Sequence, residues 1–198
     1  KLRNPRKMWS SRLAWQISIF MGMQSVIYYV FSAWLPSMLQ DWGMDVARSG
    51  MMVFYIQIST IPMMFVGSFF AENPKYLKKI IWIASVLMFI GILMFIIGKT
   101  RFAILASIFN GLAIGLVFSI STMFFVIKTQ NITDSAQLSG MAQTVGYFIA
   151  GCIPPIVGLL FQTTQSWTFP LWMLLVVPFV MCTSGLMAAK DRVIEVAN

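Results

Sequence analysis

Residues 80–98 read Ile-Ile-Trp-Ile-Ala-Ser-Val-Leu-Met-Phe-Ile-Gly-Ile-Leu-Met-Phe-Ile-Ile-Gly. This stretch of 19 residues carries no charge, and Ser85 supplies its one hydroxyl group. A helix of about 20 apolar residues is long enough to cross the hydrocarbon core of a bilayer. The stretch therefore predicts a membrane-spanning helix that is apolar on every face.

Charged residues are absent from most of the chain. All 20 of them, among 198 residues, lie outside five windows that together hold 151 residues. The last window, 135–189, is long enough for two helices and contains the polar interruption Gln162-Thr-Thr-Gln-Ser-Trp167. Dividing it there predicts an all-α membrane protein with six transmembrane helices, at residues 13–40, 49–71, 80–98, 102–127, 135–161 and 168–189.

Two other architectures agree poorly with these windows. Strands of a membrane β-barrel alternate apolar and polar residues over about ten positions, whereas these windows are continuous and rich in Leu, Ile, Met and Phe. The outer helices of a soluble bundle carry a charged face, and the windows contain no charge. Both comparisons favour transmembrane helices.

The basic residues predict how the chain crosses the membrane. If the N-terminus is cytoplasmic, eleven of the 14 Lys and Arg residues fall on the cytoplasmic side, and Arg48, Lys99 and Arg101 fall outside. Short cytoplasmic loops are enriched in Lys and Arg. We therefore expect a multi-pass protein of the inner (cytoplasmic) membrane of a bacterium, with both termini cytoplasmic. A cytoplasmic linker would occupy residues 1–12, the helical bundle 13–190 and a cytoplasmic tail 191–198.

The composition argues against enzymatic chemistry and against a nucleic-acid partner. The chain contains no histidine, which excludes a Ser–His–Asp triad, a Cys–His dyad and a His-ligated metal site. No Asp or Glu lies within a predicted span, so an aspartyl intramembrane protease is excluded as well. We predict no catalytic residue, no metal site and no cofactor. The net charge of +8 is explained by topology, so we expect no nucleic-acid binding.

Uncharged polar residues are distributed unevenly among the spans. Spans 80–98 and 168–189 are apolar almost all around, whereas the other four carry amides, hydroxyls and tyrosines. A helix that is apolar on every face suits contact with lipid, while buried polar groups need partners or a water-filled cavity. The pattern repeats every three spans, which indicates a 3+3 internal repeat of the kind from which transporter halves are built.

Seven polar residues in the spans are candidates for lining a cavity and binding a substrate. They are Gln24, Tyr28, Gln57, Thr60, Asn110, Gln143 and Tyr147. Several of them share one helix face through spacings of three or four residues. Amides inside a membrane are expensive to leave without a partner. Hydrogen bonding between helices is the alternative role for each residue, and the sequence leaves both roles open.

Three segments of the chain carry a family resemblance. The first span contains Leu13-Ala-Trp-Gln and Met21-Gly-Met-Gln-Ser25, the fifth begins with Leu138-Ser-Gly-Met-Ala-Gln143-Thr-Val-Gly-Tyr147, and Ser166-Trp-Thr-Phe-Pro170 enters the sixth. The whole chain resembles the C-terminal half of the cyanate/2-nitroimidazole permease family, within the major facilitator superfamily. The resemblance implies that these are the last six spans of a twelve-helix fold, arranged as a 3+3 inverted repeat.

That resemblance also implies a function. It indicates half of a secondary active transporter that moves a small polar or anionic solute, cyanate- or nitroimidazole-like, by alternating access. The partners would be the solute, membrane lipids and the N-terminal six-helix half, and an isolated half is expected to self-associate. A self-sufficient six-helix channel or homodimeric carrier is one alternative. A membrane sensor that does not transport is another.

Overall fold

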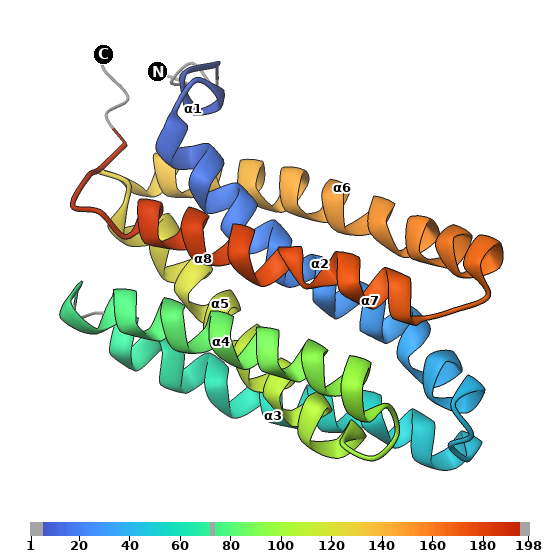
Figure 1. Ribbon diagram of the computed structural model, residues 1–198. Helices are drawn as coiled ribbons and strands as arrows, with labels where there is room; N and C mark the ends of the chain where they lie inside the picture. The colour runs from blue at the N-terminus through green and yellow to red at the C-terminus, as the bar shows by residue number, and fades with distance from the viewer. Residues whose placement is uncertain (1–5, 72–73, 195–198) are drawn as a thin grey trace.

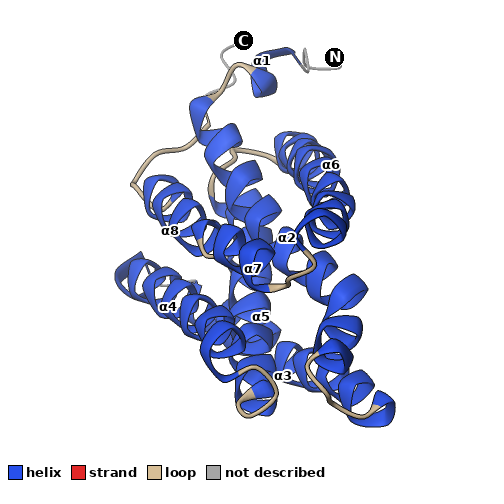
Figure 2. Cartoon of the chain, turned by 45° about the vertical axis from the view of Figure 1, so that its right-hand side comes forward, coloured by secondary structure: helices blue, strands red, loops and turns tan. Residues whose placement is uncertain are grey.

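The computed structural model describes residues 6–71 and 74–194, and all regular structure in these ranges is helical (Figure 1, Figure 2). Residues 1–5 and 195–198, in the predicted linker and tail, lie outside the described residues. The helices are α1 (Arg6–Trp9), α2 (Arg12–Asp41), α3 (Val46–Ala71), α4 (Pro74–Gly98), α5 (Ala103–Ile127), α6 (Ile132–Thr164), α7 (Thr168–Leu174) and α8 (Val176–Ala188). Six spans are long and apolar enough to cross a membrane, and α7 with α8 forms the sixth. The prediction of an all-α, six-helix membrane protein is confirmed.

Several helices begin before the charge-free windows, because polar residues cap the first turns of α2 and α6 and a proline begins α4. The hydroxyl of Ser11 accepts a hydrogen bond from the backbone N–H of Ala14, which starts α2 before the predicted window. The side-chain oxygen of Asn131 accepts one from the N–H of Asp134 over 2.9 Å, so α6 begins three residues before residue 135. Proline is well suited to the first helical turn, where Pro74 starts α4.

The sixth span is interrupted at Leu175. Pro178 lies less than one turn later and has no N–H, so the helical ladder loses one hydrogen bond there. The N–H of Leu175 lies 3.2 Å from the carbonyl oxygens of both Leu171 and Trp172. Despite this interruption, α7 and α8 together form one span, Thr168–Ala188.

Helix packing relates the first three spans to the last three. α2 packs most extensively against α6 and next against α8, while α5 packs most extensively against α3 and next against α4. The first helix of each group of three therefore packs against the second and third helices of the other group (Figure 1). Because three spans separate their starting points, α2 and α5 begin at opposite ends of the bundle. The arrangement agrees with an inverted 3+3 repeat.

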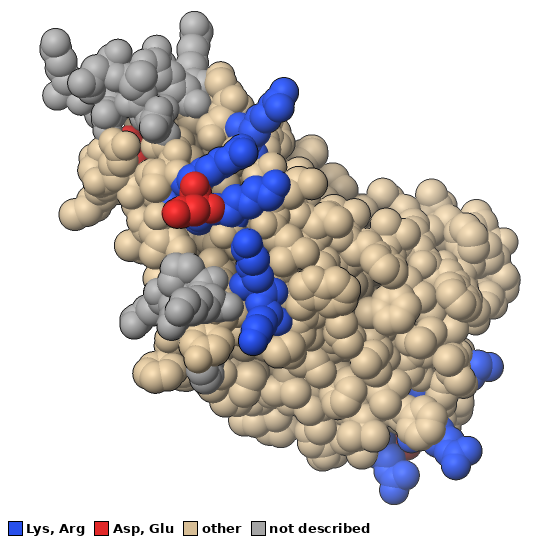
Figure 3. Space-filling view, turned by 60° about the vertical axis from the view of Figure 1, so that its left-hand side comes forward, with Lys and Arg blue, Asp and Glu red and all other residues tan. Residues whose placement is uncertain are grey.

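Charged side chains lie at the ends of the bundle. Figure 3 shows Lys and Arg gathered at two opposite ends, with a broad belt of uncharged surface between them. Large apolar side chains are exposed over this belt, including Trp82 and Ile97 in α4 and Phe179 in α8. Such a belt suits the hydrocarbon core of a bilayer. Which end faces the cytoplasm stays a prediction.

Candidate functional site

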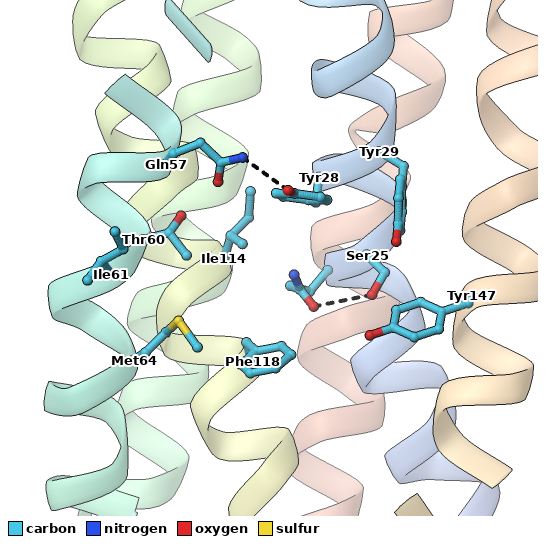
Figure 4. A pocket seen from close by; sticks show the side chains of 11 residues that line it. Ser25, Tyr28, Tyr29, Gln57, Thr60, Ile61, Met64, Ile114, Phe118 and Tyr147 are labelled. Atoms are coloured by element: carbon cyan, nitrogen blue, oxygen red, sulfur yellow. Dashed lines mark hydrogen bonds between the residues drawn. The ribbon is translucent and has the colours of Figure 1, made fainter. Parts of the chain in front are cut away.

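A pocket of about 410 Å³ lies where α2, α3, α5 and α6 meet (Figure 4). Its polar lining consists of two glutamines, three tyrosines, one serine and one threonine, and none of its lining residues is charged. The full lining is Gln24, Ser25, Tyr28, Tyr29, Gln57, Thr60, Ile61, Met64, Ile114, Phe118 and Tyr147. These residues lie near the middle of their helices, so the pocket is at mid-height in the bundle.

Five of the seven predicted residues line this pocket. They are Gln24, Tyr28, Gln57, Thr60 and Tyr147, which come from three different helices. The structure therefore brings together side chains that are up to 123 positions apart in the chain. Their role in binding a solute stays a prediction.

Asn110 is placed elsewhere. Its side chain is fully buried on α5, where Nδ2 donates a hydrogen bond to the carbonyl oxygen of Ala106 over 2.8 Å. It packs against Gly91 of α4, and a Cβ atom on that glycine would collide with the amide. The Oδ1 atom has no hydrogen-bond partner among the described residues. Asn110 thus lies in the contact between α4 and α5 rather than in the pocket.

Gln143 also lies outside the pocket lining. It is exposed on α6, and its Nε2 donates a hydrogen bond to the hydroxyl of Ser139 over 2.8 Å. The sequence places Ser139, Gln143 and Tyr147 on one face of a helix, but of these three only Tyr147 reaches the pocket. Gln143 lies about one helical turn before Tyr147 on the same face of α6, and its side chain is exposed rather than part of the pocket lining.

Six lining residues were not among the candidates. Ser25 and Tyr29 follow Gln24 and Tyr28 directly and repeat their spacing of four residues, so this signal was available in the sequence. Ile61, Met64, Ile114 and Phe118 are apolar and look like any other residue of a membrane span. No sequence pattern distinguishes an apolar cavity wall from a lipid-facing surface.

α2 and α6 form one closely packed helix pair on one side of the pocket. A Cβ atom on Gly22 would lie 3.0 Å from the Cα of Gly146, so the two backbones touch where the helices cross. Further along, the indole of Trp34 donates a hydrogen bond to the carbonyl oxygen of Pro154 over 2.8 Å. The same indole packs against Gly158, which has no side chain to block it. Small residues permit this close approach in membranes.

α3 and α5 form a second close pair on the other side. A Cβ atom on Gly111 would collide with the carbonyl oxygen of Ile56, and one on Gly115 would collide with that of Thr60. The hydroxyl of Thr60 lies 3.1 Å from the carbonyl oxygen of Gly111 and can donate a hydrogen bond to it. The pocket therefore lies between two helix pairs that are each packed backbone to backbone.

One side-chain hydrogen bond within the pocket joins the two helix pairs. The Nε2 of Gln57 in α3 donates to the hydroxyl oxygen of Tyr28 in α2 over 3.0 Å (Figure 4). The ring of Tyr28 meets that of Tyr29 edge to face at 5.3 Å, and Tyr29 meets Tyr147 in the same manner at 6.2 Å. A row of three aromatic rings thus runs from the hydrogen bond across α2 to α6.

The hydrogen bond determines which polar atoms are left to face a ligand. A tyrosine hydroxyl that accepts one hydrogen bond can still donate its own hydrogen, and a glutamine that donates from Nε2 still has its Oε1 acceptor. Tyr28 and Gln57 therefore present a donor and an acceptor beside an aromatic wall. This combination suits a small, flat, polar molecule. The described pocket offers no cation to pair with an anion.

The fold and the pocket define a multi-pass membrane protein with an uncharged polar cavity. No family model matches the chain. It is similar to an uncharacterized transporter, YycB, of Bacillus subtilis, with 34% identity over 188 residues that make up 94% of this chain and 46% of the relative. It is also similar to a 2-nitroimidazole transporter of Escherichia coli, with 29% identity over 190 residues that make up 96% of this chain and 48% of the relative. The chain thus spans about half the length of each, and both names give a transport role, in agreement with the prediction that the protein is not an enzyme.

Proposed function

We propose that the chain is one six-helix half of a secondary transporter that moves a small polar or anionic solute across a bacterial cytoplasmic membrane by alternating access. The observation that carries the proposal is the uncharged polar pocket at mid-height between α2, α3, α5 and α6. Transporters built from repeats bind their solutes near the middle of the membrane, between the repeats. The similarity to two proteins named as transporters supports the same function.

The lengths of the relatives support a half-transporter. The chain matches 46% and 48% of them, so each relative has about as much chain again outside the match. We infer that the additional part forms an N-terminal half with six further spans, whose helices complete the cavity. The gene sequence upstream of Lys1 tests this inference. Six further apolar windows are expected there, whereas a start codon directly before Lys1 would favour a self-sufficient channel or homodimeric carrier.

The pocket chemistry supports a solute that is small, flat and polar. Tyr28 and Gln57 offer a donor and an acceptor, and the tyrosine row offers ring faces and edges. A nitroimidazole-like solute meets these demands because its flat ring carries an N–H group and nitro oxygens. Cyanate is small enough to enter as well, but an anion would need its positive partner from the N-terminal half, since no cation lines this pocket.

Uptake by the complete gene product in liposomes tests the proposal. The purified protein is reconstituted and supplied with labelled 2-nitroimidazole or labelled cyanate, under a pH gradient or a membrane potential. We expect at least one probe to accumulate above the level in protein-free liposomes. No accumulation of either probe under either driving force would overturn the proposal and would favour a membrane sensor.

Pocket variants make the same assay specific to this site. Loss of one net hydrogen bond to the solute corresponds to roughly 3- to 10-fold weaker binding. We therefore expect Tyr28→Phe and Gln57→Leu to lower uptake at low solute concentration by about this factor. Tyr76→Phe, near the start of α4 and far from the pocket, is a matched control that should leave uptake unchanged. If Tyr28→Phe and Gln57→Leu both take up the solute as well as the wild type does, the pocket is not part of the transport path.

A further inference from the structure

A second, larger hollow lies at one end of the bundle, away from the pocket described above. It has a volume of about 620 Å³ and lies between the first turns of α3 and the turn that joins α4 to α5. Six of its ten lining residues are apolar, and two are the arginines Arg48 and Arg101. We call this hollow the arginine groove.

Both arginines stand at the boundary of the apolar belt. Arg48 directly precedes the charge-free window 49–71, and Arg101 directly precedes the window 102–127. Their side chains are exposed, and no ion pair of either is found in the part of the chain that the structure describes. The acidic residue nearest to Arg48 along the chain is Asp45. Its carboxylate accepts hydrogen bonds from the backbone N–H groups of Ala47 and Arg48. The two guanidinium groups are therefore available to an external anion.

The apolar part of the groove lies deeper in the bundle. Ile104 and Leu105 lie in the first turn of α5, just after the turn that holds Arg101, so they are further from the end of the bundle than Arg101. Met51 follows Arg48 by three residues and lies at a similar depth. These three side chains are 49%, 47% and 48% exposed, so they form an apolar wall that nothing in the described chain covers.

We propose that the arginine groove binds one anionic phospholipid of the surrounding membrane. The phosphate would accept hydrogen bonds from Arg48 and Arg101 at headgroup level, since guanidinium groups match phosphate oxygens in geometry and charge. The acyl chains would lie along Met51, Ile104 and Leu105. A free inorganic anion would use the arginines but would leave this apolar wall in water, which is why the lipid is favoured.

Lipid retention by the purified complete protein tests the proposal. The protein in detergent is mixed with phosphatidylglycerol or phosphatidylcholine of identical acyl chains, and bound lipid is counted by native mass spectrometry. We expect the wild type to retain phosphatidylglycerol at least tenfold more tightly, because basic residues at the membrane surface favour anionic headgroups. Equal retention of both lipids would overturn the proposal, because the two arginines would then not select an anionic headgroup.

Variants locate the site. Arg48→Gln with Arg101→Gln should abolish the preference for phosphatidylglycerol, while Lys99→Gln, which removes a neighbouring cation outside the groove, should retain it. An unchanged monodisperse elution profile shows that the double variant folds, and the headgroup comparison in the wild type holds independently of it. Inorganic phosphate is the third ligand in the assay. If phosphate displaces phosphatidylglycerol at equal concentration, the groove is a site for a soluble anion and the lipid proposal fails.

Discussion

Gln57 of α3 donates a hydrogen bond over 3.0 Å to the hydroxyl oxygen of Tyr28 in α2, across the space between two closely packed helix pairs. Backbone contacts at Gly22 and Gly146 hold α2 to α6, and contacts at Gly111 and Gly115 hold α3 to α5. The pocket is bounded by these two pairs. A solute in the pocket therefore lies between two closely packed helix pairs. It can form hydrogen bonds with Gln57 and Tyr28 in addition to their mutual hydrogen bond or in place of it.

Removal of this link should loosen the contact between the pairs. In Tyr28→Phe the N–H of Gln57 loses its acceptor within the pocket, and we expect the protein to lose about 0.5–1.5 kcal/mol of stability. Thermal unfolding of the purified protein in detergent measures the effect. Tyr55→Phe is the matched control, because it removes a tyrosine hydroxyl of α3 that makes no hydrogen bond in the described chain. An unfolding temperature of Tyr28→Phe equal to that of the wild type would show that the hydrogen bond contributes nothing to the fold.

The backbone contact of α3 with α5 should tolerate no side chain. Gly111→Ala places a methyl group against the carbonyl oxygen of Ile56, and overpacking of this kind costs about 1–3 kcal/mol. Gly140→Ala makes the same chemical change at an open position of α6, where a Cβ meets nothing within 4 Å. We expect a clear drop in unfolding temperature for the first variant and none for the second. A drop of the same size in both would contradict the assigned packing.

Asn110 should matter for packing and not for the solute. Because it is fully buried against α4, Asn110→Ala should leave the KM for an accumulated probe unchanged within about twofold. Gln57→Ala should raise the same KM roughly 3- to 10-fold, since it removes a polar group from the pocket. Concentration-dependent uptake measures both values. The reverse order of effects would return Asn110 to the candidate site and remove Gln57 from it.

A buried lysine at one end of the bundle predicts a pH dependence. The Nζ of Lys128 donates a hydrogen bond to the carbonyl oxygen of Lys190, and the N–H of Ile194 donates to the carbonyl oxygen of Lys128. Burial lowers the pKa of Lys128 below its ordinary value of 10.5, and the nearby Asp191 opposes this shift. The side chain therefore ties the end of α5 to the segment that follows α8.

The sign of the effect follows from proton uptake. Between the lowered pKa of Lys128 and 10.5, the unfolded chain holds the proton and the folded chain does not, so stability rises with pH in this interval. The full gain in stability is present above pH 10.5, and it is lost as the pH falls through the lowered pKa of Lys128. Lys128→Met cannot titrate, so the wild type should gain stability relative to this variant as the pH rises toward 10.5. Parallel unfolding curves of the two proteins at every pH would contradict the assignment.

The sequence was sufficient for the number and type of the helices because charge and hydrophobicity determine what can enter a membrane. It was less reliable for helix ends. The caps at Ser11 and Asn131 extend α2 and α6 into charged segments, where hydropathy alone predicts a loop. The sixth span is interrupted near Pro178, but the exact position of the break, at Leu175, depends on how one backbone N–H is shared between two carbonyl groups, which hydropathy does not predict.

The candidate site was only partly predictable for a related reason. Polarity shows that an amide in a membrane needs a partner, but it does not show which way the helix is rotated. Gln57 and Tyr28 form a hydrogen bond with each other in the pocket. Asn110 instead donates a hydrogen bond to the carbonyl oxygen of Ala106, one turn earlier in its own helix. Ile114 and Phe118 line the pocket because of the way α5 packs against its neighbouring helices. Those contacts exist only in the folded bundle.

Solute protection of a single cysteine tests the central claim, that the pocket between the helix pairs holds the transported solute. In the complete protein with Cys152→Ser and Cys182→Ser, Met64→Cys places a thiol on the pocket lining, and Thr129→Cys places a control thiol beyond α5. Reaction with N-ethylmaleimide is timed with and without the probe that accumulates in liposomes. At ten times its Kd the probe should slow labelling at Met64→Cys about tenfold, since only the unoccupied fraction reacts, and should leave Thr129→Cys unaffected. An unchanged labelling rate at Met64→Cys, in a protein that still transports the probe, would contradict the account.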